Sequence, residues 1–241
     1  MTGNGILGGI TAVQGATAGN NVCHYIQCVN NGDITATATQ AVSSSAMAGI
    51  AAFYSPGSVF EYCINTGFVT NTKSVYTAGI AANNKGSATA DYPVVFKGCV
   101  NTGNIASSAQ QIAGIVAYIT NYTSVDSCLN YGTIEQGIWG AAGICYTMAG
   151  TTSSLTNCIN YGDVSVTQYN AGGIVGNCAS TTAVIENCVN VGNITSTTTA
   201  EKNNYGVGGI AGSSYATMKN CFNAGKVVGK LRVGGIVGSP S

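Results

Sequence analysis

Charged side chains are scarce in this chain. Only 7% of its 241 residues are Asp, Glu, Lys or Arg, against about 25% in an ordinary globular domain. The formal net charge is zero, so the basic surface used for nucleic-acid binding is not expected. Strong helix formers are correspondingly few, which argues against a helical fold. Disorder is not expected either, because 45% of the residues are hydrophobic and Val and Ile recur at fixed intervals.

Long hydrophobic runs and a leader are also missing. No stretch approaches the roughly 20 apolar residues of a membrane helix, so no membrane span is expected. Met1 is followed by Thr-Gly-Asn-Gly, which lacks the basic and apolar regions of a secretory signal. The chain starts and stops inside its repeat, which favours a fragment or a repeating subunit. It has one histidine, His24, and no Cys-x-x-Cys, so we expect no zinc site and place His24 on the surface of a terminal coil.

The most prominent feature that the sequence does contain is an internal repeat. One unit reads Cys, apolar, Asn, any, Gly, any, Ile or Val, and its successive starts lie 35, 36, 29, 30, 30 and 33 residues apart. A second unit, Gly-Ile preceded by Gly or Ala, alternates with the first at a period near 30. The first unit starts at Cys28, Cys63, Cys99, Cys128, Cys158, Cys188 and Cys221. The second starts at Gly9, Gly49, Gly79, Gly114, Gly143, Gly173, Gly209 and Gly235.

Each half-repeat has the pattern of a β-strand. The residues three places before and one place after each Cys are always apolar and share strand parity, so both should face one core. One 30-residue unit cannot bury an apolar face alone, but stacked units can. We therefore predict that residues 1–241 form a single all-β domain, a parallel β-helix (β-solenoid) of seven to eight coils, about 35–40 Å long at about 4.8 Å per coil. The alternative is two coils of about 15 residues per repeat.

The Asn and Gly columns of the Cys unit indicate a bend. The Asn side chains are predicted to form a hydrogen-bonded amide ladder, with a polar ligand-binding stripe as the alternative. The Gly residues two places later are predicted to adopt positive φ, so Gly162→Val should lower the melting temperature. The Asn column comprises Asn30, Asn65, Asn101, Asn130, Asn160, Asn190 and Asn223.

The Cys column is predicted to be a ladder of small apolar thiols, because stacked cysteines point in parallel and disulfides need convergent side chains. Any disulfide should involve Cys23, Cys145 or Cys178, which lie outside the column, and Cys23 and Cys28 are the nearest pair in sequence.

A charge pattern supports stacking in register. The column two places before each Cys pairs opposite charges on neighbouring coils and places no two like charges together, at about 0.2–1 kcal/mol per pair. Its members are Ile26, Glu61, Lys97, Asp126, Thr156, Glu186 and Lys219.

Two segments make the repeat resemble a known family. The Cys unit Asn157-Cys-Ile-Asn-Tyr-Gly-Asp-Val164, followed by Ala171-Gly-Gly-Ile-Val-Gly176, is similar to GLUG-type repeats, and so is the segment from Cys221 to Gly238. The resemblance covers essentially the whole chain. It implies an extracellular β-solenoid stalk or adhesive module of bacterial surface and secreted proteins, including non-catalytic parts of IgA-cleaving peptidases. The Cys column departs from many such repeats, which carry Ser or Ala there.

Three classes of function are considered. The first is a non-catalytic structural or adhesive module that is extracellular or on the cell surface. Its expected partners are neighbouring copies or further repeats at the solenoid ends, which would assemble end to end into a filament. A glycan or a host surface protein is a further expected partner. We expect no catalytic, cofactor-binding or metal-binding residue and no cofactor. The alternative is a carbohydrate-binding or carbohydrate-active β-helix. Asp33 and Asp163 share a column but are expected four coils apart, too far for joint glycoside chemistry.

Inserts and exposed aromatic residues are the places where a binding site would lie, if the chain has one. The third class is a flat-faced binder of ice or polysaccharide, suggested by Thr-rich segments at residues 35–39 and 195–199 that do not recur in every coil. The insert Asn83–Pro93 carries Lys85, Asp91 and Tyr92. Tyr131 and Tyr161 share a column on adjacent coils. Plain packing is the expected role of both the insert and the tyrosine pair, with binding of a sugar or a protein as the alternative.

Overall fold

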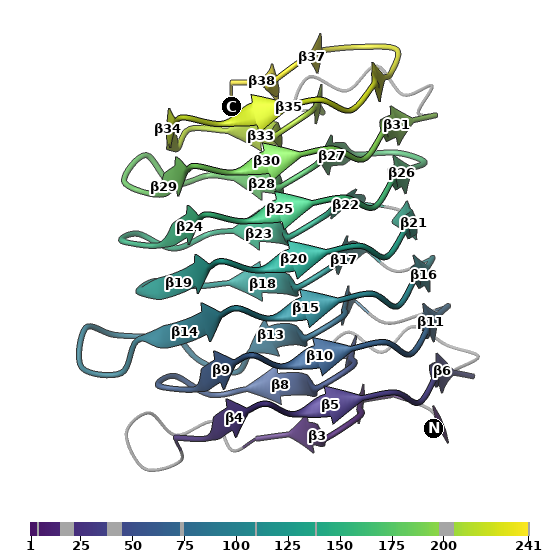
Figure 1. Ribbon diagram of the computed structural model, residues 1–241, viewed down its shortest axis with the longest axis vertical. Coiled ribbons are helices and arrows are strands. Elements are labelled where there is room, and N and C mark those ends of the chain that lie inside the picture. Colours follow the sequence, from purple (N-terminus) through teal and green to yellow (C-terminus); the bar gives the residue numbers. More distant parts are fainter. Residues whose placement is uncertain are drawn as a thin grey trace.

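The chain winds into coils stacked along one axis, with the N-terminus at one end of the stack and the C-terminus at the other (Figure 1). This computed structural model describes residues 1–3, 5–14, 22–37, 45–72, 75–108, 110–137, 139–197 and 205–240. The described residues form 38 strands and no helix. The strands make five parallel sheets of seven or eight strands, so the predicted all-β parallel β-helix is confirmed.

We name the five sheets A to E. Each complete coil contributes one strand to each sheet, in the order D, E, A, B and C along the chain. Coil 1 runs from β4 to β8 and coil 7 from β34 to β38, and three strands, β1 to β3, precede coil 1. Sheet D comprises β4 (His24–Ile26), β9 (Val59–Glu61), β14 (Val94–Lys97), β19 (Thr123–Asp126), β24 (Ser154–Thr156), β29 (Val184–Glu186) and β34 (Thr217–Lys219). Sheet E comprises β5 (Val29–Asn30), β10 (Ile64–Asn65), β15 (Val100–Asn101), β20 (Leu129–Asn130), β25 (Ile159–Asn160), β30 (Val189–Asn190) and β35 (Phe222–Asn223).

The other three sheets each have eight strands. Sheet A comprises β1 (Thr2–Gly3), β6 (Ile34–Ala36), β11 (Val69–Asn71), β16 (Ile105–Ser107), β21 (Ile134–Gly137), β26 (Val164–Val166), β31 (Ile194–Ser196) and β36 (Val227–Val228). Sheet B comprises β2 (Leu7–Gly8), β7 (Ala46–Ala48), β12 (Tyr76–Ala78), β17 (Gln111–Ala113), β22 (Gly140–Ala142), β27 (Asn170–Gly172), β32 (Val207–Gly208) and β37 (Val233–Gly234). Sheet C comprises β3 (Thr11–Val13), β8 (Ala51–Tyr54), β13 (Ala81–Asn84), β18 (Val116–Ile119), β23 (Cys145–Met148), β28 (Val175–Cys178), β33 (Ala211–Ser214) and β38 (Val237–Ser239).

One repeat makes one coil. Ile64 pairs with both Val29 and Val100, so each Cys unit stacks directly on the next. The alternative of two coils per repeat is therefore wrong. Each half-repeat is also more than a single strand: the Cys half supplies the strands of sheets D, E and A, and the Gly-Ile half supplies those of sheets B and C.

The residue before each Cys changes the parity of the chain. It adopts left-handed backbone angles in every coil, with φ between 51° and 61°. Strand alternation is interrupted there, so the Cys and the Asn two places later point inward and the residue between them points outward. Val29 and Phe222 are 46% and 60% exposed, and the five residues between them in this column are half-buried. The prediction that this column faces the core was wrong for this reason.

The Gly column of the Cys unit has a different role from the predicted one. Gly162 and its column neighbours do not adopt positive φ, so that prediction was wrong. A Cβ on Gly162 would lie 2.0 Å from the carbonyl oxygen of Gly132 in the preceding coil. Glycine is required here because successive coils approach too closely for any side chain.

The core lies inside the coils and is built from uninterrupted columns. The rings of Tyr25, Phe60 and Phe96 stack at 4.5 and 4.6 Å, and Tyr54 packs edge-on against the two Phe rings. The charge column has the predicted register, with Lys97 paired to both Glu61 and Asp126 and Glu186 paired to Lys219. No helix in the described part of the chain is long and apolar enough to cross a membrane.

Candidate functional site

The predicted amide ladder is present and buried. From Asn30 to Asn190, each Asn side chain donates from Nδ2 to Oδ1 of the Asn in the next coil at 2.8 Å. Nδ2 also donates to the carbonyl oxygen of the Gly two places on, as Asn130 does to Gly132 at 2.9 Å. Asn65 to Asn190 have no exposed surface, so the ladder offers nothing to a ligand and is structural.

The second Gly column makes room for this ladder. A Cβ on Gly143 would lie 2.2 Å from the Asn160 side chain and 2.2 Å from the backbone of Gly173. The same relation holds from Gly9 to Gly209. The two alternating sequence units are therefore complementary, because the Gly-Ile unit packs its bare backbone against the Asn of the Cys unit across the interior.

The Cys column is a ladder of free thiols, as predicted, and all ten cysteines are unpaired. Cys63, Cys99, Cys128, Cys158 and Cys188 are fully buried. Burial raises the pKa of Cys128 and of Cys145 well above the ordinary value, so both stay neutral thiols. Cys128 is therefore a poor nucleophile, and the fully buried thiols of the column act as core packing.

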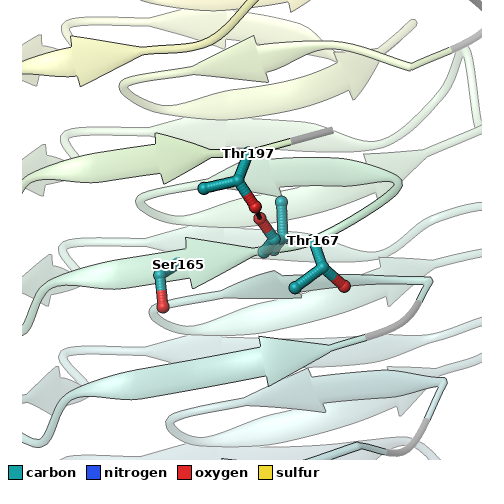
Figure 2. A pocket seen from close by; sticks show the side chains of 4 residues that line it. Ser165, Thr167 and Thr197 are labelled. Carbon is teal, nitrogen blue, oxygen red and sulfur yellow. Dashed lines mark hydrogen bonds between the residues drawn. The ribbon is translucent and has the colours of Figure 1, made fainter. Parts of the chain in front are cut away.

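Two adjoining hollows lie on the outer face of sheet A. Hollow 1, of about 290 Å³, includes Glu135 of coil 4 and Asp163 of coil 5. Hollow 2, of about 230 Å³, shares Ser165 with it and continues toward Thr167 and Thr197 (Figure 2). Hollow 1 is lined by Thr133, Glu135, Asp163, Val164, Ser165, Asn193 and Thr195. Hollow 2 is lined by Ser165, Val166, Thr167 and Thr197.

Aromatic side chains flank the hollows on both sides. Tyr131 and Tyr161, at the corner between sheets E and A, stack at 4.7 Å with an interplanar angle of 3°, as their shared column predicted. At the corner between sheets A and B, Trp139 lies 5.8 Å from Tyr169, which lies 4.1 Å from Tyr205 between ring centroids. These five side chains and both hollows belong to coils 4 to 6, and we call this surface the coil 4–6 face.

Tyr146 anchors the backbone at the corner that carries Trp139. The hydroxyl of Tyr146, a buried residue, donates to the carbonyl oxygen of Trp139 at 3.0 Å. Gly140 has φ of 151°, and a Cβ there would lie 2.5 Å from the Tyr146 ring. Burial raises the pKa of Tyr146, so its hydroxyl remains a donor at any physiological pH. The Tyr146 bond and the absent Cβ together present the Trp139 ring at the surface.

Two carboxylates, Glu135 and Asp163, line hollow 1 of the coil 4–6 face. The other two of residues 123–137, 139–197 and 205–214, Asp126 and Glu186, lie in sheet D, in register with Lys97 and Lys219. These ranges contain no Lys, Arg or His, and Lys202 lies outside the described residues. Asp163 has a structural role as well, because its Oδ1 accepts the backbone N–H of Asn193 at 2.7 Å. Asn193 in turn accepts the backbone N–H of Lys226 at 3.2 Å. An Asn side chain can thus supply the same bond in this column.

The remaining residues singled out by the sequence pattern lie elsewhere. In the insert Asn83–Pro93, the Lys85 ammonium lies 5.1 Å above the Phe53 ring, and a third hollow of about 190 Å³ lies beside Ser87. Asp33 is in coil 1 and Asp163 in coil 5, four coils apart as expected. His24 is exposed on edge strand β4. Thr39, Thr198 and Thr199 of the Thr-rich segments lie outside the described residues.

In the described part of the chain, no three His, Cys, Asp or Glu side chains are grouped closely enough to hold a metal ion. Comparison with known proteins identifies no relative: no protein-family model matches the chain, and neither a curated protein nor a solved structure is significantly similar to it.

Proposed function

We propose that this chain is a non-catalytic structural and adhesive repeat module of a cell-surface or secreted protein, and that its end coils stack on further coils of the same pattern. The observation that carries the proposal is that the Cys, Asn, Gly and Ile columns run through every coil and stay open at both ends. The extracellular location rests on the resemblance of the repeat to GLUG-type repeats.

The end coils expose side chains that are core residues elsewhere. Ile10 and Ile236, the first and last members of the Ile column, are 49% and 39% exposed. The six isoleucines between them, from Ile50 to Ile210, have no exposed surface. A further coil would bury both end residues, at roughly 25 cal/mol per Å² of apolar surface removed from water.

The Asn ladder gives the two ends complementary hydrogen-bonding groups. Among the described residues, Oδ1 of Asn30 accepts no bond from a preceding Asn, and Nδ2 of Asn223 donates only to Gly225. One end therefore presents an acceptor and the other a donor. A coil stacked in the same direction would pair both, whereas a reversed one would not.

Joining two copies end to end in register requires an added Cys unit between them. Coil 7 ends with β38 in sheet C, whereas β1 lies in sheet A. A second copy stacked directly would leave sheets D and E without a strand at the junction. A Cys unit from a further repeat supplies both strands.

A tandem protein tests this. Ser239 pairs with Ser213, which pairs with Asn177, and Thr2 pairs with Thr35, so a duplicate of residues 180–193 placed between Ser241 and Met1 should continue the coil in register. We expect one unbroken rod of about twice the length by small-angle scattering, with a higher melting temperature than the single chain.

The control is the same tandem joined by a Gly/Ser linker of equal length, which should behave as two rods moving independently. Equal scattering profiles and melting temperatures for the two tandem proteins would contradict the stacking proposal.

A further inference from the structure

We propose that the coil 4–6 face is a binding site for a neutral polysaccharide. The inference rests on the proposed adhesive function and names its ligand class. It follows from three features that the repeat does not require and that coincide on the same coils. These are the two hollows, the lining of hollow 1, among the described residues, by two carboxylates and no cationic side chain, and two aromatic rims, one of Tyr131 and Tyr161 and one of Trp139, Tyr169 and Tyr205.

The aromatic rim is specific to these coils. Trp139, Tyr169 and Tyr205 each lie four residues before the Gly of the Gly-Ile unit, and the same position holds other residue types in the remaining coils. These other residues are Ser45, Val75, Gln110 and Leu231. The aromatic contacts therefore do not arise from the packing that every coil needs. Trp139 is 42% exposed, so a large part of its ring is not used for packing within the chain and is open to a ligand.

The floor between the rims suits sugar hydroxyls. Glu135 and Asp163 accept hydrogen bonds, and the hydroxyls of Ser165, Thr195 and Thr197 both donate and accept. Glu135, Ser165 and Thr195 lie in one column at the coil spacing of about 4.8 Å, so an extended chain of similar units lying along the solenoid axis meets a polar side chain at each step. Aromatic rings at the edges can cover the apolar C–H faces of the sugar rings.

Charge decides between neutral and anionic chains. In the described part of the chain, Glu135 and Asp163 are the only charged residues that line the two hollows, and their carboxylates repel sulfate, phosphate and uronate groups. The two tyrosines of the other rim stack face to face, so they present ring edges and hydroxyls rather than open faces. They fit polar contacts at the margin of the site, and Trp139 and Tyr169 are the residues available for ring contact.

Trp139 is the only tryptophan of the chain, so its fluorescence reports directly on this site. The intact protein is titrated with cellohexaose, mannohexaose and chitohexaose, and separately with a heparin hexasaccharide. We expect at least one neutral hexasaccharide to shift the emission in a saturable manner and to protect Trp139 from acrylamide quenching. Heparin should do neither.

Variants of the face then test which groups bind. Tyr169→Ala, and the double variant Glu135→Gln with Asp163→Asn, should each weaken binding at least tenfold at an unchanged melting temperature, because Asn keeps the structural acceptor. Thr195→Ala should also weaken it. Thr70→Ala is the matched control in the same outward column of sheet A in coil 2, and should bind like the parent chain.

The proposal is overturned if no neutral hexasaccharide at millimolar concentration changes Trp139 emission, if heparin binds more tightly, or if the face variants bind as well as the parent. Rod formation by the bridged tandem without saccharide binding would leave the scaffold proposal standing and reject this one. Saccharide binding without rod formation would do the reverse.

Discussion

At the scale of single residues, the chain depends on positions where no side chain fits. The Gly columns place the backbones of successive coils in contact, and one of them packs against the buried Asn ladder. From Asn65 to Asn190, each ladder Asn has its amide hydrogens and its oxygen paired inside the coil stack. Losing one partner would leave buried polar groups unpaired at about 1–3 kcal/mol each. The Gly and Asn residues that repeat most strictly are therefore those that least tolerate substitution.

Gly162→Val tests this tolerance. The new Cβ would meet the Gly132 carbonyl oxygen at 2.0 Å, and backbone cannot move aside as a side chain can. We expect a loss of about 3 kcal/mol or more and a melting temperature about 6–12 °C lower. Gly32→Ala in the same column is the control, because its nearest neighbour would be 3.9 Å away, and it should melt within about 2 °C of the parent. Equal effects at both positions would contradict the close-approach explanation.

At the scale of elements, the left-handed residue between sheets D and E decides which side chains enter the core. Asn157, Asn187 and Asn220 occupy this position in coils 5 to 7, and Gly98 in coil 3, all of them residues that tolerate positive φ. On the outside, Asn187 and Asn220 continue an exposed amide ladder from Asn157. Without this bend, simple alternation would turn the Asn ladder outward.

Ser127 allows the bend to be tested without touching the core. Ser127→Val places a β-branched residue at φ of 54°, and we expect a loss of about 1–2 kcal/mol in the free energy of unfolding, measured by urea denaturation. Ser127→Gly should cost less than about 0.5 kcal/mol, since glycine occurs at this position in coil 3. A valine variant as stable as the glycine variant would show that the bend does not need left-handed geometry.

At the scale of the whole molecule, the described coils enclose a continuous interior of buried side chains, part of which is exposed at the two end coils. The thiol ladder reports this directly. Cys23, Cys28 and Cys221 are partly exposed, and they lie in the first and last complete coils or next to them. The other seven cysteines are buried. The access of a thiol reagent to the buried cysteines therefore measures whether the stack of coils is closed along its sides.

We expect Ellman's reagent to modify three thiols of the native chain and ten after unfolding in urea, with mass spectrometry placing the three at Cys23, Cys28 and Cys221. In the bridged tandem, the two thiols facing the junction, Cys221 of the first copy and Cys28 of the second, should become protected. Rapid native labelling of Cys128 or Cys158 would show that the coils separate.

Much of the fold could be predicted because the same residue pattern recurs in every coil. The period near 30, the charge column from Glu61 to Lys219 and the amide ladder all follow from one-dimensional spacing, since stacked coils turn equal positions into columns. The parity change escaped prediction, although the Asn at positions 157, 187 and 220 was a usable signal. Strand alternation assumes an uninterrupted strand, and one left-handed residue invalidates it.

The candidate face was only partly predictable. The stack of Tyr131 and Tyr161 followed from their shared column, and the constant spacing of Trp139, Tyr169 and Tyr205 from the Gly-Ile unit could have placed the second rim as well. Glu135 and Asp163 belong to different columns, so only the winding of the coil brings them into one hollow.

The sequence by itself determined the repeat, its register and the columns that stack, because these depend on residue type and spacing alone. The tertiary structure decided which members of each column face inward, why each glycine is needed and which polar and aromatic residues share one surface. Those properties depend on backbone angles at the bends and on distances between coils, which no one-dimensional pattern contains.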